Sequence, residues 1–122
     1  RFIFLRITLF LNAKEINRSV VGIRSRIGDG TIIQNSYVMG NDFYQNIDDM
    51  NEDIKSGNQL VGIGERCFIK NAIVDKNCRI GNDVYINGGN HLEDVSNDLY
   101  AIKDGIVVIK KGAIIPDNYV IK

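Results

Sequence analysis

The 122-residue sequence has few cysteines, a single histidine, no net charge and no long apolar run. Its two cysteines, Cys67 and Cys78, form neither a CxxC pair nor a disulfide framework, so we expect reduced, buried small side chains and a cytoplasm-like compartment. His91 and these cysteines are too scattered for a ligand set, so we expect no metal site. Fifteen basic and fifteen acidic residues cancel. No global field therefore favours nucleic acid or an anionic membrane, and we expect neither as a partner.

The amino-terminal stretch is apolar but short. Arg1–Leu11 contains two arginines and no small-residue cleavage site, and its eleven residues fall short of the roughly 20 that span a bilayer. The first residue is arginine rather than methionine. We expect residues 1–13 to be an aberrant or truncated segment, in effect a damaged or edge coil, and residues 14–122 to form one domain.

An internal repeat dominates the rest of the sequence. Its hexads have an aliphatic residue first, often glycine second, and a small or aliphatic residue fifth. Examples are Val21-Gly22-Ile23-Arg24-Ser25-Arg26, Ile63-Gly64-Glu65-Arg66-Cys67-Phe68 and Ile80-Gly81-Asn82-Asp83-Val84-Tyr85. Glycine in the second place permits close backbone approach and positive φ. The fifth residue must fit a narrow interior, and the residues at that place are Ser25, Thr31, Cys67, Cys78, Val84 and Ala113.

Pentads alternate with the hexads and set a coil length. They begin at Ile16, Ile33 and Ile69, and the intervals from Ile16 to Ile33 and from Ile69 to Ile86 are both 17 residues. The interval from Ile33 to Ile69 is 36 residues, so this coil has 19 residues more than the 17-residue coil length. We place this surplus in a polar corner loop at about residues 41–60.

These intervals predict an all-β protein: a left-handed parallel β-helix, a hexapeptide-repeat solenoid, with one long corner loop. Sustained helical spacing of apolar residues is absent, which argues against amphipathic helices. The register breaks near His91, so we expect Gly88–Asp104 to leave the solenoid and Ile109–Ile121 to form a final partial coil. Because a solenoid cannot stop without exposing strand edges, its ends need caps or partners.

Three groups of residues are candidates for chemistry. His91 is a conceivable catalytic base, but a surface histidine in a Gly/Asn loop is the favoured interpretation. The acidic run 48–53 is favoured as a solvated loop over a calcium site, because it lacks EF-hand geometry. Arg24 and Arg26 alternate with inward residues and should project outward. Together with Lys110 and Lys111 they suit the phosphate oxygens of a phosphorylated metabolite, although solvated surface charges are the alternative.

Several longer strings resemble one family, the glucose-1-phosphate adenylyltransferases (ADP-glucose pyrophosphorylases), in their C-terminal domain. The resemblance covers about Lys14 to Ile121 in order, with the insertion in the same place. It is carried by Ser19-Val20-Val21-Gly22-Ile23-Arg24-Ser25-Arg26-Ile27-Gly28, Met39-Gly40-Asn41-Asp42-Phe43-Tyr44, Gly62-Ile63-Gly64, Ala72-Ile73-Val74-Asp75-Lys76-Asn77-Cys78-Arg79-Ile80-Gly81, Asp104-Gly105-Ile106-Val107-Val108 and Ile114-Ile115-Pro116-Asp117.

The resemblance implies a function for a larger protein. That family condenses ATP with glucose 1-phosphate into ADP-glucose and pyrophosphate, toward glycogen or starch, as a magnesium-dependent tetramer. Its catalysis belongs to an N-terminal nucleotidyltransferase domain, so we expect no catalytic residue, and no ATP or Mg²⁺ site, in this chain. The β-helix domain carries subunit contacts and allosteric control in the family. We expect a location in the cytoplasm, or in the plastid stroma if the source is a plant.

The allosteric residues carry over in part. The family lysine that binds a phosphorylated activator falls on Lys111, whereas a second family lysine aligns near Gly89, where this sequence has none. The leading hypothesis is thus a regulatory and oligomerisation fragment, inactive alone. The alternatives are a stand-alone hexapeptide-repeat acyltransferase that uses His91, and a purely structural solenoid.

Overall fold

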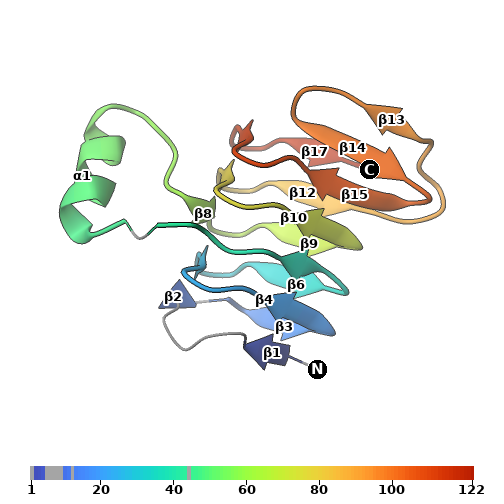
Figure 1. The fold of residues 1–122 in the computed structure, drawn as a ribbon, viewed down its shortest axis with the longest axis horizontal. Helices are drawn as coiled ribbons and strands as arrows, with labels where there is room; N and C mark the ends of the chain where they lie inside the picture. The colour runs from blue at the N-terminus through green and yellow to red at the C-terminus, as the bar shows by residue number, and fades with distance from the viewer. Residues whose placement is uncertain (1, 5–9, 12, 44) are drawn as a thin grey trace.

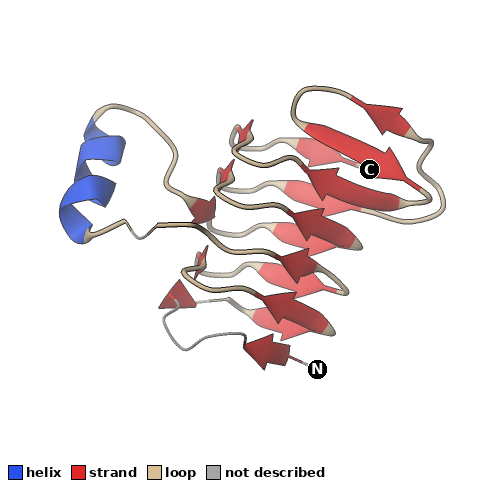
Figure 2. Ribbon diagram, viewed as in Figure 1, coloured by secondary structure: helices blue, strands red, loops and turns tan. Residues whose placement is uncertain are grey.

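Short strands form coils that stack on one another, from the blue amino-terminal coil to the red carboxyl-terminal coil (Figure 1). The computed structural model describes residues 2–4, 10–11, 13–43 and 45–122, and for residues before Ala13 it describes the backbone alone. Figure 2 shows that strands make up the stack and that a single helix stands apart from it. The predicted all-β class is confirmed.

Three sheets form the sides of the stack. Sheet A contains, in spatial order, β1 (Phe2–Phe4), β4 (Ser19–Val21), β7 (Tyr37–Val38), β10 (Ala72–Val74), β15 (Ile106–Ile109), β14 (Tyr100–Lys103) and β13 (Val95–Ser96). Sheet B contains β2 (Phe10–Leu11), β5 (Arg26–Ile27), β8 (Gly62–Ile63), β11 (Arg79–Ile80) and β16 (Ile114–Ile115). Sheet C contains β3 (Glu15–Asn17), β6 (Ile32–Gln34), β9 (Phe68–Lys70), β12 (Tyr85–Asn87) and β17 (Val120–Ile121).

Strand register follows the predicted coil length. Ile16 pairs with Ile33, Ile33 with Ile69, and Ile69 with Ile86, all in parallel. The extra residues of the long coil therefore leave the stack without shifting its register. Each coil adds one strand to every sheet, which is why equivalent isoleucines lie directly above one another.

The first and fifth residues of the hexads form the core. The side chains of Ile33, Ile69, Ile86 and Ile115 have no exposed surface. All six predicted fifth-position residues are buried as well: Ser25, Thr31, Cys67, Cys78, Val84 and Ala113. Burying an aliphatic side chain of this size contributes about 1.5–3 kcal/mol, so the isoleucine columns are the main source of stability.

Glycine in the second place of the hexad allows the backbones of adjacent coils to approach each other closely. An added Cβ on Gly64 would lie 2.4 Å from the carbonyl oxygen of Gly81 in the next coil. The expectation of positive φ at this place is wrong. Positive φ falls on the fourth residue of the hexad instead, for example 55° at Arg66 and 58° at Asp83. The chain turns the corner from one sheet to the next at that fourth residue, and the left-handed conformation makes this turn.

The corner loop contains a helix that the sequence analysis did not predict. α1 (Ile47–Lys55) begins at Asn46, whose side chain accepts a hydrogen bond from the Asp49 amide while the Asp49 carboxylate accepts one from the Asn46 amide. This capping box satisfies donors that would otherwise be unpaired at the helix start. None of the helix residues is buried. The helix therefore depends on its caps rather than on core packing, and its apolar pattern is too short to stand out in the sequence.

The excursion near His91 is confirmed and forms a cap. β14 pairs antiparallel with β15 through a turn at Asp104 and Gly105, whose φ values of 52° and 80° fit the type I′ hairpin turn. Leu92 and Leu99 pack against the core from this segment. Ile109 consequently lies above Val74, where an unbroken register would have placed His91.

The amino-terminal segment contributes an edge coil to the described part of the stack. β1 pairs with β4 and β2 pairs with β5, both in parallel. The register offset is 17 residues in the first pair, Phe2 with Ser19, and 16 in the second, Phe10 with Arg26. The remaining positions of the predicted segment 1–13, namely 1, 5–9 and 12, lie outside the described residues.

Candidate functional site

Arg24 lies at the corner between sheets A and B and is partly buried. Its φ of 55° turns the chain there. Its Nε donates a hydrogen bond to the Asn41 carbonyl at 2.9 Å, and the Asn41 side-chain amide donates to the Arg24 carbonyl at 2.7 Å. Asn41 is where the corner loop leaves the stack, so this arginine fastens the start of the loop.

Arg26 fastens the end of the same loop. Its Nε donates to the Val61 carbonyl at 2.9 Å, one residue before β8. Burial lowers the pKa of its guanidinium, and the nearby Cys67 and Glu65 partly offset this effect. Arg24 and Arg26 thus lie outside the core, as expected, but they do not face open solvent. Both side chains lie against the loop, because the loop carbonyls at its two ends need donors that the solenoid ladder does not supply.

The two lysines of the last coil lie in different surroundings. Lys110 is partly buried, and its Nζ donates to the Ser96 hydroxyl at 3.1 Å and to the Asn97 carbonyl of the cap. Lys111 is exposed. The Asn77 side-chain amide, the neighbouring Lys76 and, more weakly, Lys111 hold the pKa of the Asp42 carboxyl below its usual range. Three of the four predicted effector residues are thus engaged by the chain itself, and Lys111 is the one that faces solvent.

His91 and the acidic run occupy solvent-facing positions. His91 is exposed in the turn that begins the cap, and an added Cβ on Gly89 would lie 2.8 Å from its Nδ1. The run 48–53 forms most of α1 rather than an irregular loop. Within the described part of the chain, no three His, Cys, Asp or Glu side chains converge as metal ligands would.

Arg79 holds α1 to the stack. It lies on β11, and its Nη1 donates to the Asp53 carboxylate at 2.8 Å and to the Gln59 carbonyl at 2.6 Å. The hydrogen bond from Arg79 to the Asp53 carboxylate, with another from Gln45, lowers the pKa of Asp53. The Gln45 side chain also accepts from the Val61 amide at 2.9 Å and so joins the two ends of the loop. Helix and loop are therefore fixed relative to sheet B.

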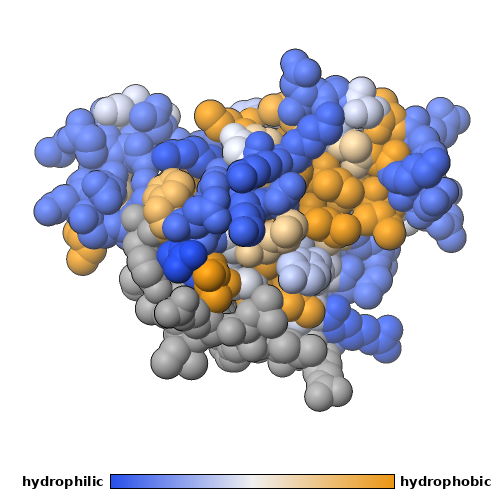
Figure 3. Space-filling view, in the orientation of Figure 1, coloured by the Kyte–Doolittle hydropathy of each residue, from blue (hydrophilic) through white to orange (hydrophobic). Residues whose placement is uncertain are grey.

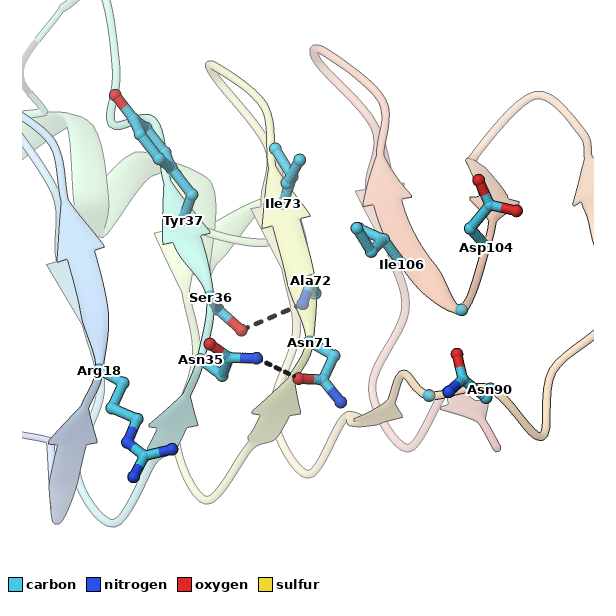
Figure 4. Close-up of a pocket in the computed structure, with 12 residues that line it drawn as sticks. Arg18, Asn35, Ser36, Tyr37, Asn71, Ala72, Ile73, Asn90, Asp104 and Ile106 are labelled. Atoms are coloured by element: carbon cyan, nitrogen blue, oxygen red, sulfur yellow. Dashed lines mark hydrogen bonds between the residues drawn. The ribbon is translucent and has the colours of Figure 1, made fainter.

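A groove of about 590 Å³ runs along the corner between sheets C and A (Figure 4). Its floor is a row of corner residues at equivalent places in successive coils, Arg18, Asn35 and Asn71, with Asp104 at the far end. The Asn35 amide donates to the Asn71 side-chain oxygen at 2.6 Å. This row was not predicted from the sequence, although Arg18, Asn35 and Asn71 are each the third residue of a pentad.

Sheet A carries an apolar column on its outer side. Register aligns Val20, Tyr37, Ile73 and Val108 across four coils. Tyr37 is 42% exposed, and Ile106 beside the column is 45% exposed. This face points toward the viewer in Figure 3, where apolar atoms gather over the upper coils. Contiguous exposed apolar surface on a soluble domain is typical of protein–protein contact.

The geometry defines a class: a three-sided parallel β-helix with hexapeptide coils, a capped carboxyl end and one long corner insertion. Family comparison identifies the particular family. The model of the GLGC left-handed parallel beta-helix domain matches residues 8–120, and the chain belongs to this family. The left-handed class and the resemblance to the C-terminal domain of glucose-1-phosphate adenylyltransferase are thereby confirmed.

None of the described helices is long and apolar enough to cross a bilayer.

Proposed function

We propose that this chain acts as the subunit-contacting and regulatory β-helix domain of a glucose-1-phosphate adenylyltransferase and is inactive alone. The family match supports the parent enzyme. The contact role is supported chiefly by one observation, the apolar column of Val20, Tyr37, Ile73 and Val108 on sheet A. An apolar residue at the same place in these four coils presents a continuous apolar strip to a partner. Stable subunit interfaces have such a core of apolar contacts.

In this proposal ATP, glucose 1-phosphate and Mg²⁺ bind to a nucleotidyltransferase domain elsewhere in the parent enzyme. The protein would serve ADP-glucose formation for glycogen or starch in the cytoplasm or the plastid stroma, within a tetramer of homologous subunits.

The regulatory part of the proposal rests on Lys111. Its exposed ammonium group is available to a phosphorylated metabolite, whereas Arg24, Arg26 and Lys110 already donate to carbonyl groups of the chain. An effector that used those three would have to displace their present partners. We therefore expect Lys111→Ala to lower the affinity for a phosphorylated effector more than Lys110→Ala does.

Two measurements test the contact role. The purified chain should give no ADP-glucose from ATP, glucose 1-phosphate and Mg²⁺, and it should associate with a family nucleotidyltransferase domain supplied separately. Replacing Tyr37 and Ile73 by lysine should abolish this association in light scattering, whereas Val95→Lys, an exposed substitution on the cap, should not. Turnover by the chain alone, or association that survives the double substitution, would contradict the proposal.

A further inference from the structure

Helix α1 stands beside the solenoid with its apolar side chains uncovered. Ile47 is 76% exposed and Ile54 is 62% exposed, and their positions differ by seven, close to two helical turns, so both lie on one stripe of the helix. Met50 lies between them and is partly buried. In Figure 1 the helix projects away from the coils on the side of sheet B. Among the described residues, none covers the outer side chains of the stripe, Ile47 and Ile54.

The helix is nevertheless fixed in place. The capping box holds its first turn, and the Arg79–Asp53 ion pair at 2.8 Å holds its second to the stack. Arg24 and Arg26 hold the two ends of the loop. Binding to an apolar stripe on a mobile loop would cost the entropy of ordering that loop. Because the helix is already ordered, a partner that binds its stripe avoids most of this cost.

A groove of about 660 Å³ lies between the solenoid and the first part of the stripe, Ile47 and Met50. Apolar side chains of Ile47 and Met50 line one wall, and the carboxylates of Asp29, Asp48 and Glu65 stand around it. Glu65 is paired with Arg66 at 2.9 Å, whereas Asp29 and Asp48 have no side-chain partner among the described residues. We call this feature the α1 groove.

The charge in the lining of the α1 groove is negative overall. The described lining contains three carboxylates, Asp29, Asp48 and Glu65, although the chain as a whole is neutral. Among the described residues that line the groove, the one cation is Arg26, which is already bound to the Val61 carbonyl. An apolar wall within a negative field complements an apolar segment that carries positive charge, and it repels an acidic one.

We propose that the α1 groove is a docking site for a short, amphipathic, basic protein segment. The segment places its apolar side chains against Ile47, Met50 and Ile54 and its basic side chains beside Asp29 and Asp48. Anchoring by an apolar stripe flanked by opposite charge is the usual arrangement when a helix binds in a groove. This site lies on the sheet B side and is separate from the apolar column of sheet A.

Peptide binding to the purified chain tests the docking site. The probe is a dye-labelled 14-residue helical peptide of leucine and lysine, and its control is the same peptide with glutamate in place of lysine. Fluorescence anisotropy should show binding of the lysine peptide and no binding of the glutamate peptide. The affinity for the lysine peptide should fall as the salt concentration rises. Amide chemical shifts of the chain should change around residues 45–50 and 26–29 and remain constant on sheet A.

Matched variants locate the site. Ile47→Ser with Ile54→Ser should weaken lysine-peptide binding at least tenfold, and Asp29→Asn with Asp48→Asn should weaken it severalfold. Val95→Ser with Val120→Ser removes two exposed aliphatic side chains elsewhere and should leave binding unchanged. All six positions are exposed, so circular dichroism should show an intact solenoid in each variant.

Several results would overturn the proposal. These are equal binding of the two peptides, no binding of either, or undiminished binding to the Ile47→Ser/Ile54→Ser variant. Self-association of the chain that this variant abolishes in the absence of peptide would also overturn it, because the occupant would then be a second copy of the chain. Failure of the sheet A contact tests would leave these results unaffected.

Discussion

At the scale of single residues, the turns impose two different demands on the backbone. The fourth hexad residue needs positive φ, and the chain places Arg66, Asn77, Asp83 and Asn118 there at 55–63°. The left-handed conformation costs a non-glycine residue about 1–2 kcal/mol, less for Asn and Asp. The second residue has ordinary φ but no room for a side chain, as at Gly64.

Substituting alanine at two glycines should separate these demands. In Gly64→Ala the new methyl group would lie 2.4 Å from the Gly81 carbonyl oxygen, so the coils must move apart. Gly57 has φ of 76° and no atom within 4 Å of an added Cβ, so alanine there meets backbone strain alone, about 1–2 kcal/mol. Urea denaturation should show the larger loss of stability for Gly64→Ala, and equal losses would contradict the close-approach argument.

The buried thiols should resist alkylation. Burial raises the pKa of Cys78 to about 11 from its ordinary 9.0, and it also raises the pKa of Cys67. Because the fold favours the protonated thiol, this contribution to stability is complete below pH 9 and is lost as the pH rises toward 11. Iodoacetamide at pH 8 should label the native chain slowly and the urea-unfolded chain at both sites. Rapid native labelling would contradict this prediction.

At the scale of elements, α1 and the cap are held by polar contacts and small apolar patches rather than by the isoleucine columns. Asn46 and Asp49 begin the helix, and Arg79 with Asp53 fixes it to sheet B. The cap depends on the Asp104–Gly105 turn and on Leu92 and Leu99. We therefore expect both elements to open locally before the coils unfold.

The attachment of α1 should depend on pH through Asp53. Its pKa is lowered chiefly by the hydrogen bond from Arg79, so the stabilisation is complete above the ordinary value of 3.8 and is lost as the pH falls through the lower folded value. Asp53→Asn should therefore loosen the helix at pH 7, with faster amide exchange over residues 47–55. Asp48→Asn serves as the control, because Asp48 has no ion-pair partner among the described residues. Unchanged exchange in Asp53→Asn would show that the ion pair does not hold the helix.

At the scale of the whole molecule, the sequence predicts the features that repeat and misses those that occur once. Intervals between Ile16, Ile33, Ile69 and Ile86 are sufficient for the register, because parallel coils place equivalent residues in contact. The short helix has no buried residue, and its apolar residues Ile47, Met50 and Ile54 form too short a pattern to indicate a helix within a polar loop. The orientation of Arg24 and Arg26 depends on carbonyl groups 17 and 35 residues away, which local spacing does not reveal.

Cavity formation in the isoleucine columns should destabilise the whole stack. Ile69 has no exposed surface and lies between Ile33 and Ile86, so Ile69→Ala should cost about 2–5 kcal/mol. Val120 lies on the outer side of sheet C and is 52% exposed, so Val120→Ala should cost much less. Thermal unfolding checks both, and similar midpoints for the two variants would contradict the assignment of the core.

The loop attachment also makes one corner of the molecule modular. Arg24 and Arg26, two residues apart, bind the carbonyl groups at the two ends of the corner loop. The coil resumes at β8 in register with β5, as though nothing had been inserted. Segments of other lengths and sequences can therefore be exchanged between Asn41 and Val61 while the stack below and above keeps its pairing, which makes this corner a natural graft point for new recognition elements.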